Sequence, residues 1–129
     1  MKINFEDERP IFLQIAEGIE DGILLGAYQE DSQVPSTTEI SVVYKINPAT
    51  ALKGINRLVE EGILYKRRGV GMFVAKGAVL QVKEKRKAAF FEQYITRLTG
   101  EAKRLNFTLA EIIELIERSY KHGQDKQDK

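Results

Sequence analysis

In the first half of the chain, apolar residues recur at helical spacing in three separate stretches. The first stretch, residues 10–25, has an isoleucine at every fourth position, and acidic residues occupy its opposite face. The second, residues 35–45, takes its apolar face from Ile40 and Val43. The third spans residues 47–62 and again places its aliphatic residues on one side. This spacing predicts three amphipathic helices.

Residues that favour helix ends stand at the boundaries of these stretches. Ser36 is followed three residues later by Glu39, which is the spacing of a capping box. Asn47 precedes Pro48, and this pair suits the N-cap and the first position of a helix. Gly62 closes the third stretch. The connection between the second and third helices is therefore short, as in a helix-turn-helix.

A basic segment with two glycines follows the third helix. Residues 64–74 contain two short apolar runs on either side of a turn. The turn region carries Lys66, Arg67, Arg68, Gly69 and Gly71. This pattern predicts a basic β-hairpin. A helix-turn-helix followed by such a hairpin is a winged helix-turn-helix, an arrangement that reads a DNA groove.

The second half of the chain has a different pattern. A long apolar stripe over residues 78–104 predicts an extended helix, and Thr108 with Glu111 forms a capping box that opens another. The sequence therefore predicts a mostly α-helical protein with a small β-hairpin. Residues 1–76 form a winged helix-turn-helix domain, residues 77–121 a short two-helix dimerisation region, and residues 122–129 a charged, disordered tail.

The two C-terminal helices are too apolar to stand alone, and this predicts a homodimer. A second copy of the same helices would bury the stripe in a two-fold interface. The alternative is that the helices fold back onto their own N-terminal domain. The residues predicted to form the dimer interface are Val82, Phe90, Phe91, Tyr94, Leu98, Ile112, Ile113 and Ile116.

The amino-acid composition indicates the class of protein and its cellular compartment. The chain has 129 residues, of which 43% are hydrophobic and 30% charged, enough for one ordinary domain with an appendage. It contains no cysteine, which excludes a disulfide framework and thiolate chemistry. No signal peptide or long apolar run is present. We therefore expect a soluble cytoplasmic protein that does not enter a membrane.

Charge is distributed unevenly although its sum is only +1. Residues 1–34 hold eight acids and two bases, whereas residues 45–76 hold seven bases and two acids. The second region, which contains the predicted third helix and hairpin, is therefore suited to a polyanion such as double-stranded DNA. The alternative is a solvated surface whose charges neutralise one another.

Catalysis, metal binding and cofactor binding have little support in the sequence. The one histidine, His122, falls in the predicted tail, where no packed environment would orient it. One histidine and scattered carboxylates do not make a recognisable set of metal ligands. We expect no enzyme activity, no metal and no cofactor.

Several short motifs in residues 10–75 together resemble the DNA-binding domain of the GntR family of bacterial transcription regulators. These motifs are Pro10–Ala16, Val34-Pro35-Ser36, Thr50, Leu58–Leu64 and Arg67–Val74. The Asn47–Thr50 step and the short helical tail resemble the YtrA-like subfamily. The resemblance implies a dimeric repressor whose reduced C-terminal region mainly serves dimerisation.

The resemblance and the position of each residue together give the predicted DNA-binding set. The resemblance assigns DNA contacts to Ser36, Thr50, Arg67, Gly69 and Gly71. Position in the predicted fold adds Thr37, Thr38, Asn47, Ala49, Lys53, Arg57, Lys66 and Arg68. Three arginines that are usual in the family are replaced by Thr38, Pro48 and Leu52. We therefore expect a site that is less directed to guanine, or an affinity that depends more on the hairpin.

These observations predict a sequence-specific regulator that binds an inverted-repeat operator, and the resemblance makes it a repressor. Two other functions stay open. A winged helix can serve as a protein-interaction module, because fold alone does not fix function. A small-molecule effector could also bind at the dimer interface among Phe90, Phe91, Tyr94 and Ile116, although packed core is the better explanation of aromatic and aliphatic residues at helical spacing.

Overall fold

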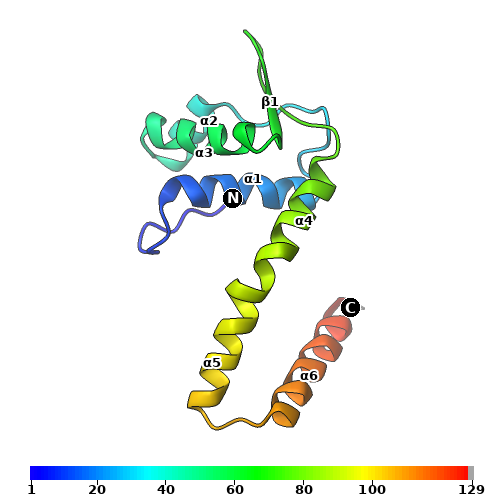
Figure 1. The fold of residues 1–129 in the computed structure, drawn as a ribbon. Coiled ribbons are helices and arrows are strands. Elements are labelled where there is room, and N and C mark those ends of the chain that lie inside the picture. The colour runs from blue at the N-terminus through cyan, green and yellow to red at the C-terminus, as the bar shows by residue number, and fades with distance from the viewer. Residues whose placement is uncertain (128–129) are drawn as a thin grey trace. The chain divides into compact units, whose positions relative to one another are not determined.

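The computed structural model describes residues 1–127. The described residues divide into two compact units, the first comprising Met1–Arg86 and the second beginning at Lys87. The first unit contains α1 (Ile11–Leu24), α2 (Thr37–Tyr44), α3 (Pro48–Glu60), the strands β1 (Leu64–Arg67) and β2 (Gly71–Val74), and most of α4 (Ala78–Phe90). The predicted fold class is confirmed: a helical head carries a small antiparallel hairpin (Figure 1).

Side-chain caps begin the helices of the helix-turn-helix. The Ser36 hydroxyl accepts a hydrogen bond from the Glu39 N–H at 3.0 Å, and the Glu39 carboxylate accepts one from the Ser36 N–H at 3.2 Å. Asn47 Oδ1 accepts a bond from the Ala49 N–H at 2.8 Å, with Pro48 at the first helical position. These bonds satisfy backbone donors that a helix leaves unpaired. Both predicted caps are therefore confirmed.

The hairpin is short and joined to the rest of the head. Its strands pair Leu64 with Val74 at the base and Arg67 with Gly71 near the tip. Gln33 forms an isolated bridge with Phe73, so the segment before α2 lies along the second strand. The base of the hairpin is thereby fixed to the domain core, while the tip projects from it (Figure 1).

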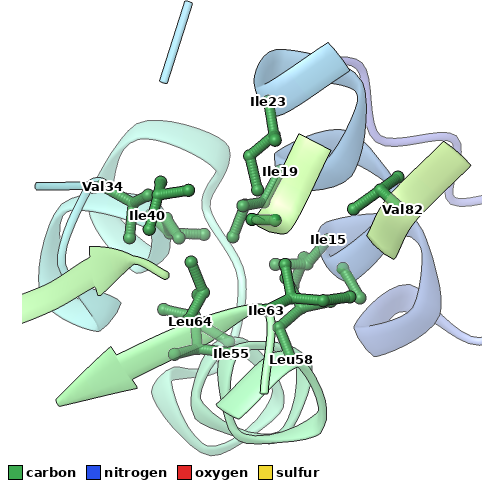
Figure 2. Close-up of a cluster of buried hydrophobic side chains, with 14 of the residues drawn as sticks. Ile15, Ile19, Ile23, Val34, Ile40, Ile55, Leu58, Ile63, Leu64 and Val82 are labelled. Carbon is green, nitrogen blue, oxygen red and sulfur yellow. The ribbon is translucent and has the colours of Figure 1, made fainter. Parts of the chain in front are cut away.

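The core of the first unit lies between α1, α3, the hairpin base and the start of α4 (Figure 2). Its largest fully buried side chains are Ile15, Ile19, Ile23, Ile40, Ile55, Leu58, Ile63, Leu64, Val74 and Val82. Gly54 marks the close contact of α3 with α1, because a Cβ at this position would lie 2.7 Å from the Phe12 carbonyl oxygen. Aliphatic packing therefore fixes α3 against α1.

Val43 and Val82 differ from their predicted roles. Val43 is not a core residue: it is 67% exposed, and half-buried Tyr44 packs against the core one turn after Ile40. Val82 is fully buried in the core of the first unit and therefore cannot contribute to a dimer interface in this conformation. The helical spacing was correct in both cases, but spacing alone does not identify the surface that a residue faces.

The first unit extends ten residues beyond the predicted boundary at residue 76 and ends at Arg86. The first turns of α4 belong to it because Ala78 and Val82 are buried in its core. Lys85 and Arg86 also form ion pairs with α1. The start of α4 is therefore a packed part of the head rather than a linker.

The second unit consists of helical segments with many exposed apolar side chains. The chain continues from α4 through a π-helical turn, η1 (Phe91–Ile95), into α5 (Thr96–Arg104), and α6 (Leu109–Gln127) follows. The predicted helix over residues 78–104 is thus interrupted by a π turn. Helix α6 continues through residues 122–127, where the sequence predicts disorder, while residues 128–129 lie outside the described part.

The predicted capping box of the second unit is present. The Glu111 N–H donates to the Thr108 hydroxyl at 3.2 Å, and the Thr108 N–H donates to the Glu111 carboxylate at 2.9 Å. The backbone hydrogen bond from Thr108 lowers the pKa of Glu111. None of the helices within residues 1–127 combines the length and apolarity needed to cross a membrane.

Candidate nucleic-acid interface

Three segments of the first unit carry the predicted DNA-binding residues. They are the N-terminus of α2, the outward side of α3 and the tip of the hairpin, which we call the wing (residues 66–71). The fold brings them into one domain because α2 and α3 pack together and the hairpin directly follows α3.

The N-terminus of α2 presents backbone donors and small hydroxyls. Ser36 uses its hydroxyl in the capping box, so a contact from Ser36 to DNA would share an oxygen that already accepts a bond. Thr37 is half-buried and Thr38 is exposed. A helix N-terminus of this kind suits a backbone phosphate, although the cap places the Glu39 carboxylate beside it.

The sequence places the α3 side chains on distinct sides of the helix. Ala51, Gly54, Ile55 and Leu58 are buried. Asn47, Ala49, Lys53 and Arg57 are exposed, and Thr50 is half-buried. Successive residues of an α-helix are rotated by about 100° around the helix axis. This rotation puts Ala49 on the side opposite the four buried residues and puts Thr50 at the edge of the buried side. Ala49 and Lys53 are therefore better placed than Thr50 to meet a ligand in front of α3.

The two cationic side chains of α3 are each held by a neighbour. The Lys53 ammonium lies 4.2 Å from the centroid of the Phe12 ring at the start of α1. The attraction of a cation to the negative face of an aromatic ring favours this position. Arg57 Nε lies 3.3 Å from a carboxylate oxygen of Glu61. Lys53 and Arg57 are therefore partly preorganised along the α1 side of the helix.

The wing is a tight turn with exposed cations. The Val70 N–H donates to the Arg67 carbonyl oxygen at 2.9 Å, and Gly69 adopts a φ of 78° that favours glycine. Lys66 and Arg68 are exposed. The Arg67 guanidinium carbon lies 4.9 Å from the centroid of the Phe73 ring, which stacks on Tyr65. The wing therefore presents three positive charges on a short, constrained support.

A buried carboxylate behind α3 was not predicted from the sequence. Glu20 of α1 was expected on the solvent-facing side, yet it is only 2% exposed. Lys85 Nζ lies 2.7 Å and Arg86 Nη2 3.3 Å from its carboxylate oxygens. Lys85 also lies 2.6 Å from Glu61, the residue that holds Arg57. An ion-pair network thus joins α1, the end of α3 and α4.

Comparison with known proteins identifies the family. Residues 12–74 match the model described as bacterial regulatory proteins, gntR family. A crystal structure described as a GntR-family transcriptional regulator from Bacteroides thetaiotaomicron is 31% identical, with a TM-score of 0.71. The match covers 88% of this chain and 98% of that one. The chain belongs to the GntR family.

Relatives within the GntR family include proteins named as repressors. HTH-type transcriptional repressor NagR from Bacillus subtilis is 37% identical over 76 residues, which are 59% of this chain and 31% of NagR. This chain thus spans only about a third of the length of NagR. HTH-type transcriptional repressor YtrA from the same organism is 27% identical over 93 residues, 72% of both chains. The predicted resemblance to YtrA is therefore confirmed.

The solved structures that resemble this chain include protein domains bound to operator DNA. The DNA-binding domain of AraR in complex with operator ORX1 is 29% identical to this chain, with a TM-score of 0.54. The match covers 58% of this chain and 96% of that domain. The present chain is accordingly a GntR-family transcriptional regulator with a winged helix-turn-helix.

Two further α3 residues of this GntR domain are exposed beside the predicted ones. Leu52 and Asn56 are exposed, and with Ala49, Lys53 and Phe12 they line a shallow open hollow. The helical spacing already placed Asn56 on the outward side, whereas Leu52 was considered only as the position of a missing family arginine. Neither belongs to the predicted set.

Proposed function

We propose that this GntR-family chain is a homodimeric repressor that binds an inverted-repeat operator in the cytoplasm. The observation that carries this proposal is the combination of a capped α3 with a basic wing directly after it. The repressor names of NagR and YtrA support the sign of regulation. The operator-bound AraR domain supports DNA as the ligand.

In the proposed complex, the N-terminal half of α3 enters the major groove. Lys53 and Asn47 reach base edges or nearby phosphates, and the N-terminus of α2 meets the DNA backbone. The wing lies over the adjacent minor groove, where negative potential is concentrated and attracts Arg67 and Arg68. Arg57 contributes mainly to backbone contacts, because it lies in the last turn of α3 and is paired with Glu61.

The proposed dimer is supported by apolar side chains from α4, η1, α5 and α6. Each of the predicted interface residues except Val82 and half-buried Ile112 is exposed. The exposed set is Phe90, Phe91, Tyr94, Leu98, Ile113 and Ile116. So many large apolar side chains are costly to leave in water, and a second copy would cover them symmetrically. The two heads would then bind two half-sites.

The test is selection of bound sequences from a random duplex pool, followed by fluorescence anisotropy of the enriched duplex at several salt concentrations. We expect an inverted repeat and a steep fall of log K with log salt. Substitution of both Arg67 and Arg68 by alanine should weaken binding and reduce the magnitude of the salt slope by roughly four, because the dimer loses two arginines from each of its two wings. The matched control removes two exposed charges elsewhere, Lys103→Ala with Lys121→Ala.

The same experiment distinguishes the other candidate functions. A protein-interaction module would enrich no sequence, and its weak DNA binding would respond equally to the wing variant and to the control. An effector-gated regulator would still enrich an operator, so its detection requires a separate screen for compounds that release the bound duplex. Enrichment of a single half-site, with a monomer in solution, would contradict the proposed dimer.

A further inference from the structure

The part of α3 that would enter the major groove has an apolar front. Ala49 and Leu52 are both exposed there, Leu52 to 43%. They lie three positions apart, so they are neighbours on the helix surface: Ala49 lies opposite the buried side chains, and Leu52 lies between Ala49 and the buried Ile55. A singly exposed leucine needs no explanation, but an exposed apolar pair on this side of a recognition helix does.

The hydrogen-bond donors usually aimed at guanine are missing from this front. Residues 48–54 contain one cation, Lys53, and its ammonium is drawn over the Phe12 ring at the α1 side of the helix. Pro48 and Leu52 have no side-chain donor. The most specific reading of guanine uses an arginine or lysine on its O6 and N7 atoms. This front therefore has little capacity for that contact.

The apolar feature available in the major groove is the C5-methyl group of thymine. Alanine and other apolar side chains recognise it by direct packing, and none of the other three standard DNA bases carries a methyl group at that edge. A shallow hollow here is lined by Phe12, Ala49, Leu52 and Lys53, with Asn56, Arg57 and Glu60 further along α3, so its apolar surface lies at the Ala49 and Leu52 end. Such a surface fits a methyl group that stands next to a phosphate backbone.

We propose that Leu52, with Ala49 beside it, is a specificity-determining residue that packs on thymine methyl groups in each operator half-site. This inference rests on the proposed function. It predicts that the preferred operator sequences have A·T base pairs opposite the N-terminal part of α3. Removing the leucine side chain removes the surface on which the methyl group packs, while the phosphate contacts of the wing are unaffected.

The test replaces thymine by uracil, which removes only the methyl group. In the duplex enriched from the random pool, each thymine is changed singly to 2′-deoxyuridine, and the dissociation constant is measured by anisotropy. We expect a loss of about fourfold at one or two positions in each half-site, the value for one buried methylene or methyl group. In Leu52→Ala, the same uracil substitutions should change the affinity less than about 1.5-fold.

Leu80→Ala is the matched control, because Leu80 is likewise an exposed helical leucine but belongs to α4. It should retain the fourfold preference for thymine. Circular dichroism establishes that each variant is folded. The inference is overturned if wild type binds every uracil duplex equally well, or if Leu52→Ala keeps the full preference; in both cases the proposed operator binding stands. Failure to enrich any duplex overturns both.

Discussion

Gly54 shows how one missing side chain positions the recognition helix. A methyl group at this residue would lie 2.7 Å from the Phe12 carbonyl oxygen and 3.1 Å from two side-chain carbons of Ile15. The first of these is a backbone atom, which cannot move without a shift of α1 itself. Helix propensity disfavours glycine inside α3 by roughly 1 kcal/mol relative to alanine. The close contact of the two helices therefore outweighs local preference here.

We predict that Gly54→Ala lowers the free energy of unfolding by about 1–3 kcal/mol, because overpacking exceeds the gain in helix propensity. Gly100→Ala is the matched variant. Its new methyl group would meet nothing nearer than the Arg104 side chain at 3.9 Å, so it should stabilise its helix by up to about 1 kcal/mol. Urea unfolding followed by circular dichroism measures both; a stabilised Gly54→Ala would refute the close-contact argument.

At the scale of elements, α4 is joined to α1 and α3 through charges as well as through Val82. Burial alone lowers the pKa of Lys85, but its hydrogen bonds to Glu20 and Glu61 outweigh burial and raise it. A raised pKa in the folded state means that the protonated ammonium favours folding. This contribution is complete below the unfolded pKa of about 10.4 and is lost as pH rises through the folded value.

Lys85→Met should therefore destabilise the head by about 1–2 kcal/mol at pH 7, a value reduced because Lys85 is partly exposed. The part of this difference that comes from the ammonium should be lost as the pH rises through the raised pKa of Lys85, which lies above its unfolded value. Urea midpoints measured from pH 7 to pH 12 give this difference directly. Lys83→Met, an exposed change on the same helix, should stay within about 0.5 kcal/mol of wild type at every pH. A constant Lys85→Met difference would contradict the pairing.

The capping box of α2 gives a second element-scale prediction. Ser36→Ala removes the acceptor of the Glu39 N–H and should cost about 1 kcal/mol of stability. Thr38→Ala, in the same first turn but outside the cap, should change stability by less than about 0.5 kcal/mol. Thermal unfolding compares the two variants. Equal melting temperatures would show that α2 is held by tertiary packing through Ile40 rather than by its cap.

At the scale of the whole molecule, the exposed apolar residues of the second unit determine the proposed assembly. Phe91 in η1 and Ile113 in α6 are both exposed and both lie outside the head. A charge at each position would have to be buried in a dimer interface without a partner, which is strongly unfavourable. The monomeric chain would carry the same charges in water at little cost.

Phe91→Asp combined with Ile113→Asp should therefore yield a monomer with a folded head. Analytical ultracentrifugation measures the mass, and anisotropy on the enriched operator should show weaker binding with about half the salt slope, since each molecule then meets one half-site. Leu25→Asp is the control, because Leu25 is also exposed but ends α1 in the head. A monomeric wild type, or a dimeric double variant, would exclude this interface.

Local sequence patterns were sufficient to predict most of the fold. The caps at Ser36, Asn47 and Thr108 formed as predicted, because each depends on atoms within three residues along the chain. The hairpin also followed, because its turn needs a positive φ that Gly69 adopts without strain. The motifs of residues 10–75 are specific enough by themselves to indicate the GntR family.

The candidate DNA-binding site was predicted less completely. The sequence placed Lys53, Arg57 and the wing cations in the predicted set without ranking them. Arg57 and Glu61 are four residues apart, so their pairing is compatible with helical spacing alone, whereas the contact of Glu61 with Lys85 depends on where α4 packs. Leu52 is absent from the predicted set because the sequence marked it only as the replacement of a usual arginine, whereas its exposure depends on which side of α3 contacts α1.

By itself, therefore, the sequence determined the caps that begin α2, α3 and α6, the wing and the family, since each is encoded in neighbouring residues. Only the tertiary structure decided that Val82 and Glu20 are buried, that the head extends to Arg86, and that Val43 is exposed. The physical reason is that helical spacing identifies residues that share a side, whereas burial and ion pairing depend on which other element covers that side.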